Sequence, residues 1–304
     1  FRGVRALMYN SPEERAMIQA IAHNEQVPSV VVGIGSEIPT NPQAQRFRQK
    51  YNIRGPFAIY VGRIDENKGC KELFDYFTTY IREGVGKLSL VLIGNSILPV
   101  PQHPRIRHLG FVDDIDKFDA MAAAELLIMP SYFESLSMVA LEAWALGRPV
   151  VANGRCDVLR GQCVRSNAGL YYDNRQEFVE SLRALERTKW LNVSLGRNGR
   201  QFFKDHYDWP VIERKYLDML AGYGVFNVGR NHPGVRKVLI DFMEGEYCSL
   251  VQMETPLLCG LLAHELKKRA GAQAPIGSSG HLCSGSRSWH AWSLARIHWA
   301  TPWS

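Results

Sequence analysis

The sequence predicts an α/β fold built on a doubly wound parallel sheet. From residue 56 onward, short apolar runs alternate regularly with amphipathic helical segments. The apolar runs are continuous, as is typical of strands whose sheet is covered by helices on both faces. The chain has 304 residues, of which 46% are hydrophobic and 22% charged, which is enough for one large domain or two ordinary ones.

The first 50 residues predict three elements in order. A helix is expected over 11–23, where Ser11 and Pro12 stand at the N-cap and at the first helical position. An apolar strand over 29–35 and a polar helix over 42–51 follow. These elements do not complete a domain by themselves.

The following elements make up the α/β unit. Predicted strands cover residues 56–63, 88–95, 106–112, 125–131, 148–153 and 169–173. Predicted helices cover residues 68–84, 113–124, 135–147, 175–187, 190–206 and 209–223. Open sheets of this kind bind ligands at the carboxyl ends of their strands, so we expect function in the loops that follow the strands.

Beyond residue 221 the character of the sequence changes. Helical periods continue without a completed βαβ unit, and from Ala272 the chain becomes rich in glycine and serine and then in tryptophan. We therefore predict one domain over 51–221 and an irregular, partly helical appendage after it. We interpret residues 272–304 as disordered or as an artefact.

Composition excludes several classes of protein. No run of about 18 uncharged apolar residues is present, and the first residues do not resemble a signal peptide. The net charge of +6 is mild and no basic stripe is interleaved with aromatic residues, which argues against nucleic acid as a partner. Six cysteines are scattered without CxxC pairs, which favours reduced thiols and the cytoplasm. Since the chain begins at Phe1 rather than Met, we expect a piece of a longer protein.

The segment over 130–151 predicts an anion site at a helix N-terminus. If Ser135 caps the helix, the backbone amides of Leu136, Ser137 and Met138 are free to bind phosphate. Met138, Leu141 and Ala145 would form the buried stripe of that helix.

Two glutamates interrupt this apolar segment. Glu134 stands just before the helix and Glu142 lies roughly 10 Å further along its axis. A nucleoside diphosphate sugar laid across the N-terminus would place its ribose near Glu142 and its sugar near Glu134. The alternative is that Glu134 only compensates the helix dipole and that Glu142 is a solvated helix residue.

The segment over 60–69 predicts a diphosphate contact after the first strand of the α/β unit. Gly62 allows close approach of the backbone, while Arg63 and Lys68 follow in the loop. A P-loop motif is absent, and no GxGxxG motif opens the fold, which argues against P-loop NTPases and nicotinamide dehydrogenases. Taken singly, Arg63 and Lys68 read as surface charges, whereas together, after a strand and opposite a helix N-terminus, they favour a diphosphate contact.

Three motifs together resemble a known family. "GRIDENKG", "LGFVDD" and "PSYFESLSMVALEAWALGRPVVA" resemble, in order and spacing, the donor-binding domain of retaining GT-B glycosyltransferases of family 4. The resemblance covers roughly residues 1–221 and implies a Rossmann-like sheet. Residues 1–50 would be the tail of the acceptor domain and the interdomain crossing.

The resemblance implies a role for each matching residue. Arg63 and Lys68 would neutralise the diphosphate and stabilise the departing nucleotide, and Glu134 would hold the sugar hydroxyls. The remaining contacts would come from the ribose-binding carboxylate, the backbone around the base and the helix amides: Glu142, Gly62, Phe111, Val112, Leu136 and Ser137. Ser137 departs from the family, in which many members carry glycine.

We expect no metal ion and no cofactor. Asp113, Asp114 and Asp116 superficially match a metal-binding DxD motif, but their position at the start of a helix favours capping. The resemblance implies a metal-independent enzyme whose donor substrate is a nucleotide diphosphate sugar. The hydroxyl acceptor stays unidentified, and peripheral membrane association is expected only through the rest of the N-terminal domain.

Residues 222–271 carry a second, weaker resemblance. "NHPGVRKVL" and "METPLLCGLLAHELKKRAG" resemble the start of class III pyridoxal-phosphate aminotransferases. The cofactor lysine of that family lies later, so no Schiff-base residue is assigned.

The sequence therefore predicts the donor-binding part of a retaining glycosyltransferase, a fragment expected to bind nucleotide but to transfer sugar poorly alone. The alternatives are a non-catalytic nucleotide-sugar-binding module and a fragment of a glycosyltransferase–aminotransferase fusion. A GT-B epimerase or phosphorylase agrees less well with the motifs.

Overall fold

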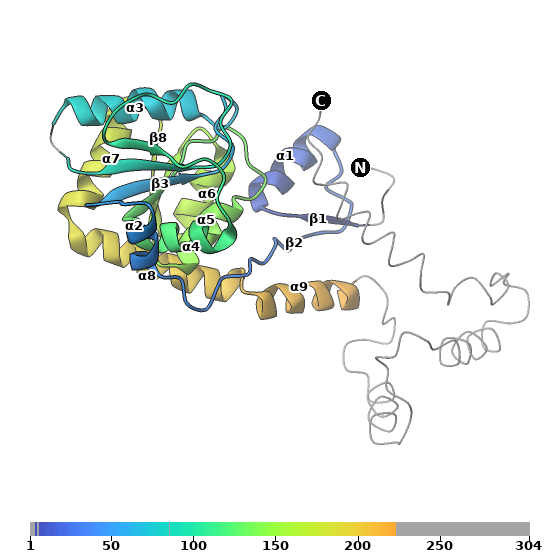
Figure 1. Ribbon diagram of the computed structural model, residues 1–304. Coiled ribbons are helices and arrows are strands. Elements are labelled where there is room, and N and C mark those ends of the chain that lie inside the picture. Colours follow the sequence, from blue (N-terminus) through green and yellow to red (C-terminus); the bar gives the residue numbers. More distant parts are fainter. Residues whose placement is uncertain (1–3, 5, 85, 223–304) are drawn as a thin grey trace, which may run out of the picture. The chain divides into compact units, whose positions relative to one another are not determined.

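A computed structural model describes residue 4 and residues 6–84 and 86–222 (Figure 1). Contacts group residues 1–229 into one compact unit. The predictions about the aminotransferase-like segment and the tail lie beyond residue 222, outside the described residues. None of the described helices is both long and apolar enough to span a membrane.

Strands and helices alternate through the described chain. The strands are β1 (Leu7–Tyr9), β2 (Ser29–Val31), β3 (Phe57–Val61), β4 (Ser89–Ile93), β5 (Ile106–His108), β6 (Leu126–Met129), β7 (Val150–Asn153) and β8 (Gly169–Tyr172). The helices are α1 (Pro12–Ala22), α2 (Ala44–Lys50), α3 (Cys70–Arg82), α4 (Asp114–Ala123), α5 (Met138–Ala145), α6 (Asp157–Ser166), α7 (Arg175–Arg187), α8 (Lys189–His206) and α9 (Trp209–Gly222).

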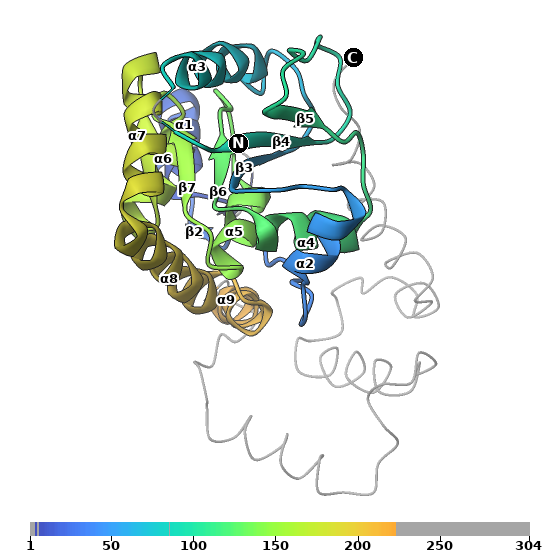
Figure 2. The ribbon, with the colours of Figure 1, turned by 60° about the vertical axis from the view of Figure 1, so that its left-hand side comes forward.

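The main sheet is parallel and doubly wound, as predicted. Its six strands lie in the order β5-β4-β3-β6-β7-β8, and every neighbouring pair is parallel (Figure 2). From β3 the chain proceeds outward in one direction to β4 and β5, and from β6 in the opposite direction to β7 and β8. The topological switch point, where open sheets bind their ligands, therefore lies between β3 and β6. Strands β1 and β2 form a separate two-stranded parallel sheet.

Both faces of the main sheet are buried under helices. Phe57, Ile59 and Val61 of β3 contribute to a core that includes residues of α2, α4, α5 and α8. Ala58 and Tyr60 point to the other face, where residues of α3 and α7 pack against the sheet (Figure 2). Because successive strand residues enter different cores, the strands have continuous apolar sequences rather than alternating ones.

Helix α5 differs from the sequence prediction at its start and on its buried side. Helix α5 is capped by Ser137, whose Oγ accepts a hydrogen bond from the Ala140 N–H at 3.3 Å, and not by Ser135. Its buried side is also wider than the predicted stripe, since residues 140–144 are all buried while Met138 and Ala145 are only partly covered.

Helix α6 was not predicted. It has Gly161 in its interior, which lowers helix propensity, and its N-cap residue Cys156 makes no side-chain capping bond. A Cβ at Gly161 would lie 1.9 Å from Glu13 Oε1, the end of a side chain of α1 that can move aside. Arg165 of α6 forms an ion pair with the same Glu13.

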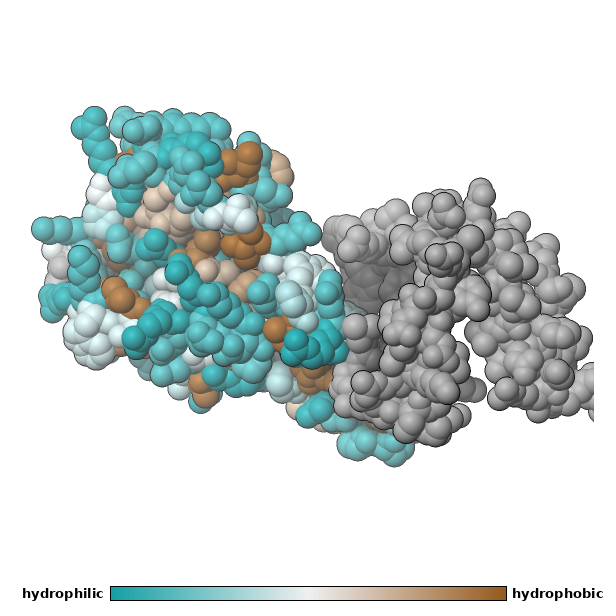
Figure 3. Space-filling view, turned by 90° about the horizontal axis from the view of Figure 1, so that it is seen from below, coloured by the Kyte–Doolittle hydropathy of each residue, from teal (hydrophilic) through white to brown (hydrophobic). Residues whose placement is uncertain are grey.

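The surface shows no dominant apolar patch on the face drawn in Figure 3. Hydrophilic residues cover most of this face, and the hydrophobic ones lie in separate small groups.

Candidate functional site

The loops after β3 and β6 meet at the switch point of the sheet. Gly69, at the end of the first loop, has a φ of +68°, and a Cβ there would lie 2.1 Å from the carbonyl oxygen of Pro130 in the second loop. The same oxygen accepts a hydrogen bond of 3.0 Å from Asn153 Nδ2 at the end of β7. The backbone of the two loops is therefore in direct contact, and only glycine fits at position 69.

Gly62 brings a third loop to this edge. Its φ is +150°, and its carbonyl oxygen would lie 2.0 Å from a Cβ on Gly94, the residue directly after β4. Its N–H donates to the Ile93 oxygen at 2.9 Å. The predicted close approach at Gly62 is thus an approach of two protein loops in this structure.

Asp65 organises the loop that carries the predicted phosphate-binding cations. It is only 2% exposed, and its Oδ1 accepts the Lys68 N–H at 2.7 Å while its Oδ2 pairs with Arg63 Nε. Burial alone raises the pKa of the Asp65 carboxyl, but the hydrogen bonds from Lys68 and Arg63 outweigh burial and hold that pKa below its ordinary value. The carboxylate is therefore ionised and holds Arg63 through Nε, which leaves the two terminal nitrogens of the guanidinium for another anion.

Lys68 crosses from this loop to the predicted sugar-binding glutamate. Lys68 Nζ lies 2.7 Å from Glu134 Oε1, and the two side chains are 34% and 13% exposed. The structure therefore brings Arg63, Lys68 and Glu134 together around the switch point, with Lys68 contacting Asp65 by its backbone and Glu134 by its side chain. Glu134 is an ion-pair partner and not only a compensator of the helix dipole.

The N-terminus of α5 begins two residues later than predicted. With Ser137 as the cap, the first amides of the helix are those of Met138 and Val139, and the side chains of Leu136 and Ser137 are buried. The prediction that Leu136, Ser137 and Met138 open the first turn was wrong by two positions, because Ser137 and not Ser135 makes the capping bond.

Glu142 is buried, so the alternative of a solvated helix residue is wrong. It is 8% exposed and accepts hydrogen bonds at Oε1 from Lys117 Nζ (3.2 Å) and Ser36 Oγ (3.3 Å). Its Oε2 is buried and has no hydrogen-bond partner within the described residues. Burial raises the pKa of this carboxyl, while Lys117 and Ser36 oppose the rise. Buried polar atoms normally have a hydrogen-bond partner, so this oxygen is a candidate acceptor for a donor outside the described residues.

The predicted base-binding residues lie after β5. Phe111 is 78% exposed, and Val112 packs at the edge of the core. Asp113 directly after them caps α4 by accepting the Asp116 N–H at 2.7 Å, as predicted from the sequence. Asp116 itself is buried and pairs with Lys50.

Sequence reasoning missed three residues of these clusters. Asp65 stands inside the motif that drew attention to Arg63 and Lys68, and its position three residues before Lys68 is the local signal that could have revealed it. Lys117 and Ser36 lie 25 and 106 residues from Glu142, and no sequence signal connects them to it.

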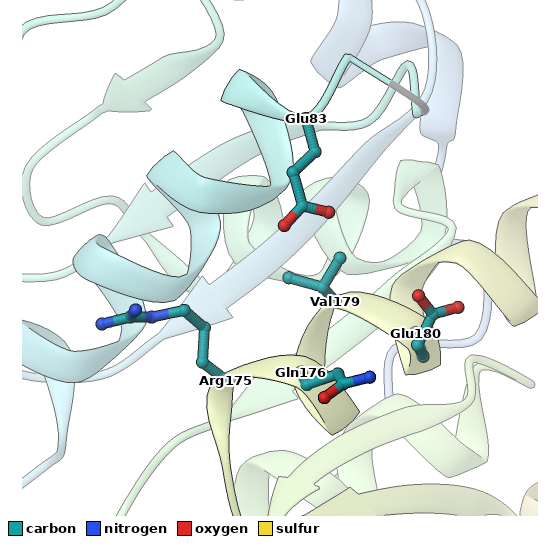
Figure 4. A pocket seen from close by; sticks show the side chains of 5 residues that line it. All are labelled: Glu83, Arg175, Gln176, Val179 and Glu180. Atoms are coloured by element: carbon teal, nitrogen blue, oxygen red, sulfur yellow. The ribbon is translucent and has the colours of Figure 1, made fainter.

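Two surface hollows lie away from these clusters. One, of about 340 Å³, lies between the end of α3 and the start of α7, where Val179 points towards Glu83 (Figure 4). The other, of about 700 Å³, lies between α1 and α6. Neither contains the residues around the switch point, so the candidate site is identified by its charged and unpartnered groups rather than by concavity. Within the described ranges, His, Cys, Asp and Glu side chains form no group of three or more that could hold a metal ion.

The described residues form an α/β domain of the doubly wound class, with charged side chains gathered at its switch point. Residues 55–187 match the sequence family described as Glycosyl transferases group 1.

Similar proteins are known in bacteria. The chain is 24% identical over 196 residues to mannosylfructose-phosphate synthase of Agrobacterium fabrum, an alignment that covers 59% of this chain and 43% of the relative. It is 28% identical over 207 residues to phosphatidyl-myo-inositol mannosyltransferase of Propionibacterium freudenreichii, covering 66% and 53% respectively. The chain thus spans about half the length of these relatives.

The fold also matches a solved structure. The crystal structure of Anabaena Alr3699/HepE in complex with UDP superposes with a TM-score of 0.63 at 17% identity, covering 72% of this chain and 64% of the other. At this identity the match concerns the fold alone, and it agrees with the doubly wound parallel sheet described above.

Proposed function

We propose that this chain is the donor-binding part of a glycosyltransferase that moves a sugar from a nucleotide diphosphate sugar to an acceptor hydroxyl, with retention of configuration and without a metal ion. The observation that carries the proposal is the meeting of Arg63, Lys68 and Glu134 at the switch point between β3 and β6. One relative is named a mannosyltransferase and the similar solved structure holds UDP, which supports the same class of donor here.

In this proposal each group has one task. The terminal nitrogens of Arg63 and the ammonium of Lys68 bind the diphosphate, Glu134 accepts from sugar hydroxyls, and Glu142 Oε2 accepts from the ribose. The bond between C1 of the sugar and the phosphate oxygen breaks, and its electron pair passes to the leaving diphosphate. A bond from the acceptor oxygen to C1 forms on the same face, and the acceptor proton passes to the departing phosphate oxygen. Arg63 and Lys68 stabilise the charge that develops there.

The first test is calorimetric titration of the chain with UDP, GDP and ADP, alongside Arg63→Ala and Glu142→Ala. Each substitution removes a charge-assisted hydrogen bond, so we expect affinity for the nucleotide that binds best to fall roughly ten- to a hundredfold. Arg175→Ala is the matched control, because Arg175 is also 53% exposed and also pairs with an aspartate, but lies on α7.

Each outcome has a different meaning. If the unmodified chain binds none of the three nucleotides, the proposal fails. If binding is unaffected by both substitutions, or falls equally in Arg175→Ala, the residue assignments fail although the fold stands. Sugar transfer or hydrolysis measured on the longer enzyme then separates a transferase from a module that only binds nucleotide sugars.

A further inference from the structure

Within the described part of the chain, Glu142 is a buried carboxylate with a single cationic partner. Around its Oε1 the structure places Lys117 Nζ from α4 and Ser36 Oγ from the segment between β2 and α2. Its Oε2 is buried without a partner among the described residues. Removing Lys117 would leave a desolvated carboxylate with only a neutral hydroxyl beside it.

Lys117 is held so that its charge faces Glu142. Its side chain is 20% exposed, and Nζ lies 3.2 Å from Glu142 Oε1 and 3.2 Å from Asp114 Oδ1, one turn earlier on the same helix. Nζ also lies 4.2 Å from the centre of the Phe118 ring. The side chain of Asp114 is 84% exposed, so water screens its attraction for Lys117. The side chain of Glu142 is 10% exposed, and its attraction for Lys117 is not screened in this way.

We propose that Lys117 is a positioning residue of the nucleotide site, which keeps Glu142 ionised and oriented so that Oε2 accepts hydroxyl hydrogens of a bound nucleoside. The inference rests on the proposed function, because it assigns Glu142 to the sugar part of a nucleotide. Ser36 contributes a second hydrogen bond to the same oxygen and ties Glu142 to the segment before α2.

The charges facing Glu142 set the expected pH dependence. Burial and the Asp114 charge raise the pKa of Glu142, and Lys117 and Ser36 oppose the rise. A protonated carboxyl loses acceptor capacity, so affinity for a nucleoside falls as pH drops through the raised pKa. Without Lys117 that pKa rises further, and the fall in affinity begins at a higher pH.

The test compares Lys117→Met with the unmodified chain by calorimetry between pH 5 and 8.5. The probes are the nucleoside diphosphate that binds best and inorganic pyrophosphate, which lacks the ribose. We expect Lys117→Met to weaken nucleoside diphosphate binding at least about tenfold more at pH 6 than at pH 8.5, since one unit of pKa shift corresponds to a tenfold change. Pyrophosphate affinity should change by the same small factor at both pH values.

Three further variants separate a positioning role of Lys117 from a packing role. Lys117→Arg keeps the charge and should restore the original pH profile. Lys50→Met is the matched control, because it breaks a lysine contact with a buried carboxylate, Asp116, in the neighbouring α2–α4 contact, and should leave the profile unchanged. In a Glu142→Gln background, Lys117→Met should add no pH dependence.

The outcomes distinguish this inference from the proposed function. If a nucleotide binds and Lys117→Met keeps the original pH profile, the inference is overturned and the proposed function stands. If no nucleotide binds to the unmodified chain, both fail. If Lys117→Met does not fold, Lys117→Gln replaces it, because glutamine keeps a hydrogen-bond donor without the charge. Lys117→Gln must then show the same loss of nucleoside diphosphate affinity at acidic pH, and an unchanged pH profile overturns the inference.

Discussion

At the scale of single residues, Gly69 decides how close the two site loops come. Its φ of +68° is a left-handed conformation, and the position that a Cβ would take is filled by the backbone oxygen of Pro130. Gly84, at the other end of α3, has nearly the same φ of +67° but nothing within 4 Å of its Cβ position. Substitutions at these two glycines, which flank the same helix, therefore distinguish the cost of a left-handed backbone from the cost of a steric clash.

We predict that Gly84→Ala lowers the free energy of unfolding by about 1 kcal/mol, the cost of a left-handed alanine. Gly69→Ala should cost a further ~1–3 kcal/mol, because a backbone oxygen cannot move aside as a side chain can, and should also weaken nucleotide binding. Denaturant unfolding of both variants measures the first effect and titration the second. Equal losses of stability in both would show that the two loops separate easily.

Residue types and local spacing identified Arg63, Lys68, Glu134 and Glu142, but not their partners. Lys68 forms a hydrogen bond with Glu134, 66 residues away in the sequence, and Ser36 forms one with Glu142, 106 residues away. Such pairs depend on which loops the sheet brings together, and a single sequence contains no local signal for them. The wrong prediction of Ser135 as the cap has a similar cause. Ser135 and Ser137 both stand just before the helix, and local sequence does not decide between them.

At the scale of elements, α5 and α8 pack through glycines of α8. A Cβ at Gly196 would lie 2.1 Å from the Gly147 oxygen, and one at Gly199 would lie 2.5 Å from Trp144 Cδ1. Trp144 is fully buried and its Nε1 donates to the Ala168 oxygen at 2.9 Å. The contact positions α5, and with it Glu142, against the rest of the domain.

Whether a glycine-to-alanine substitution raises or lowers the free energy of unfolding tests this packing. In an unpacked helix interior such a change stabilises by about 1 kcal/mol. Here we expect Gly196→Ala and Gly199→Ala both to destabilise, with Gly196→Ala the worse because it meets backbone instead of a side chain. Thermal and denaturant unfolding report the change, and a gain in stability for either variant would contradict the tight approach of the helices.

Most elements were predictable because each follows from a local pattern. Helix α7 has the predicted bounds of 175–187, with Asn174 as its capping residue. The strands of the main sheet fall inside their predicted apolar runs. Helix α6 and strand β1 were missed: α6 has a central glycine and β1 has only three residues, so neither produces a periodic signal.

At the scale of the whole described unit, the strand order places the site. The carboxyl ends of β3 and β6 are neighbours in the sheet, although Val61 at the end of β3 and Met129 at the end of β6 are 68 residues apart along the chain. A ligand at this switch point should therefore affect two distant segments together.

Hydrogen exchange with and without UDP tests that location. We expect the strongest slowing of amide exchange in residues 62–70 and 134–142, and little change in α7, because a bound diphosphate would contact both site loops and not the α3–α7 hollow. Strongest protection in α1 and α6, or around Glu83 and Arg175, would place the ligand in one of the two surface hollows instead.

The sequence by itself determined the fold class, most of the elements and the residues whose chemistry suits a nucleotide diphosphate sugar. These features depend on periodicity, residue type and short spacing, which are local properties of a chain. Only the tertiary structure decided that Asp65 holds Arg63 and Lys68 together, that Lys68 pairs with Glu134, and that Glu142 is buried beside Lys117 with one oxygen that has no partner among the described residues. These contacts arise because a parallel sheet gathers the ends of distant strands at one edge, so partners far apart in sequence become neighbours only after folding.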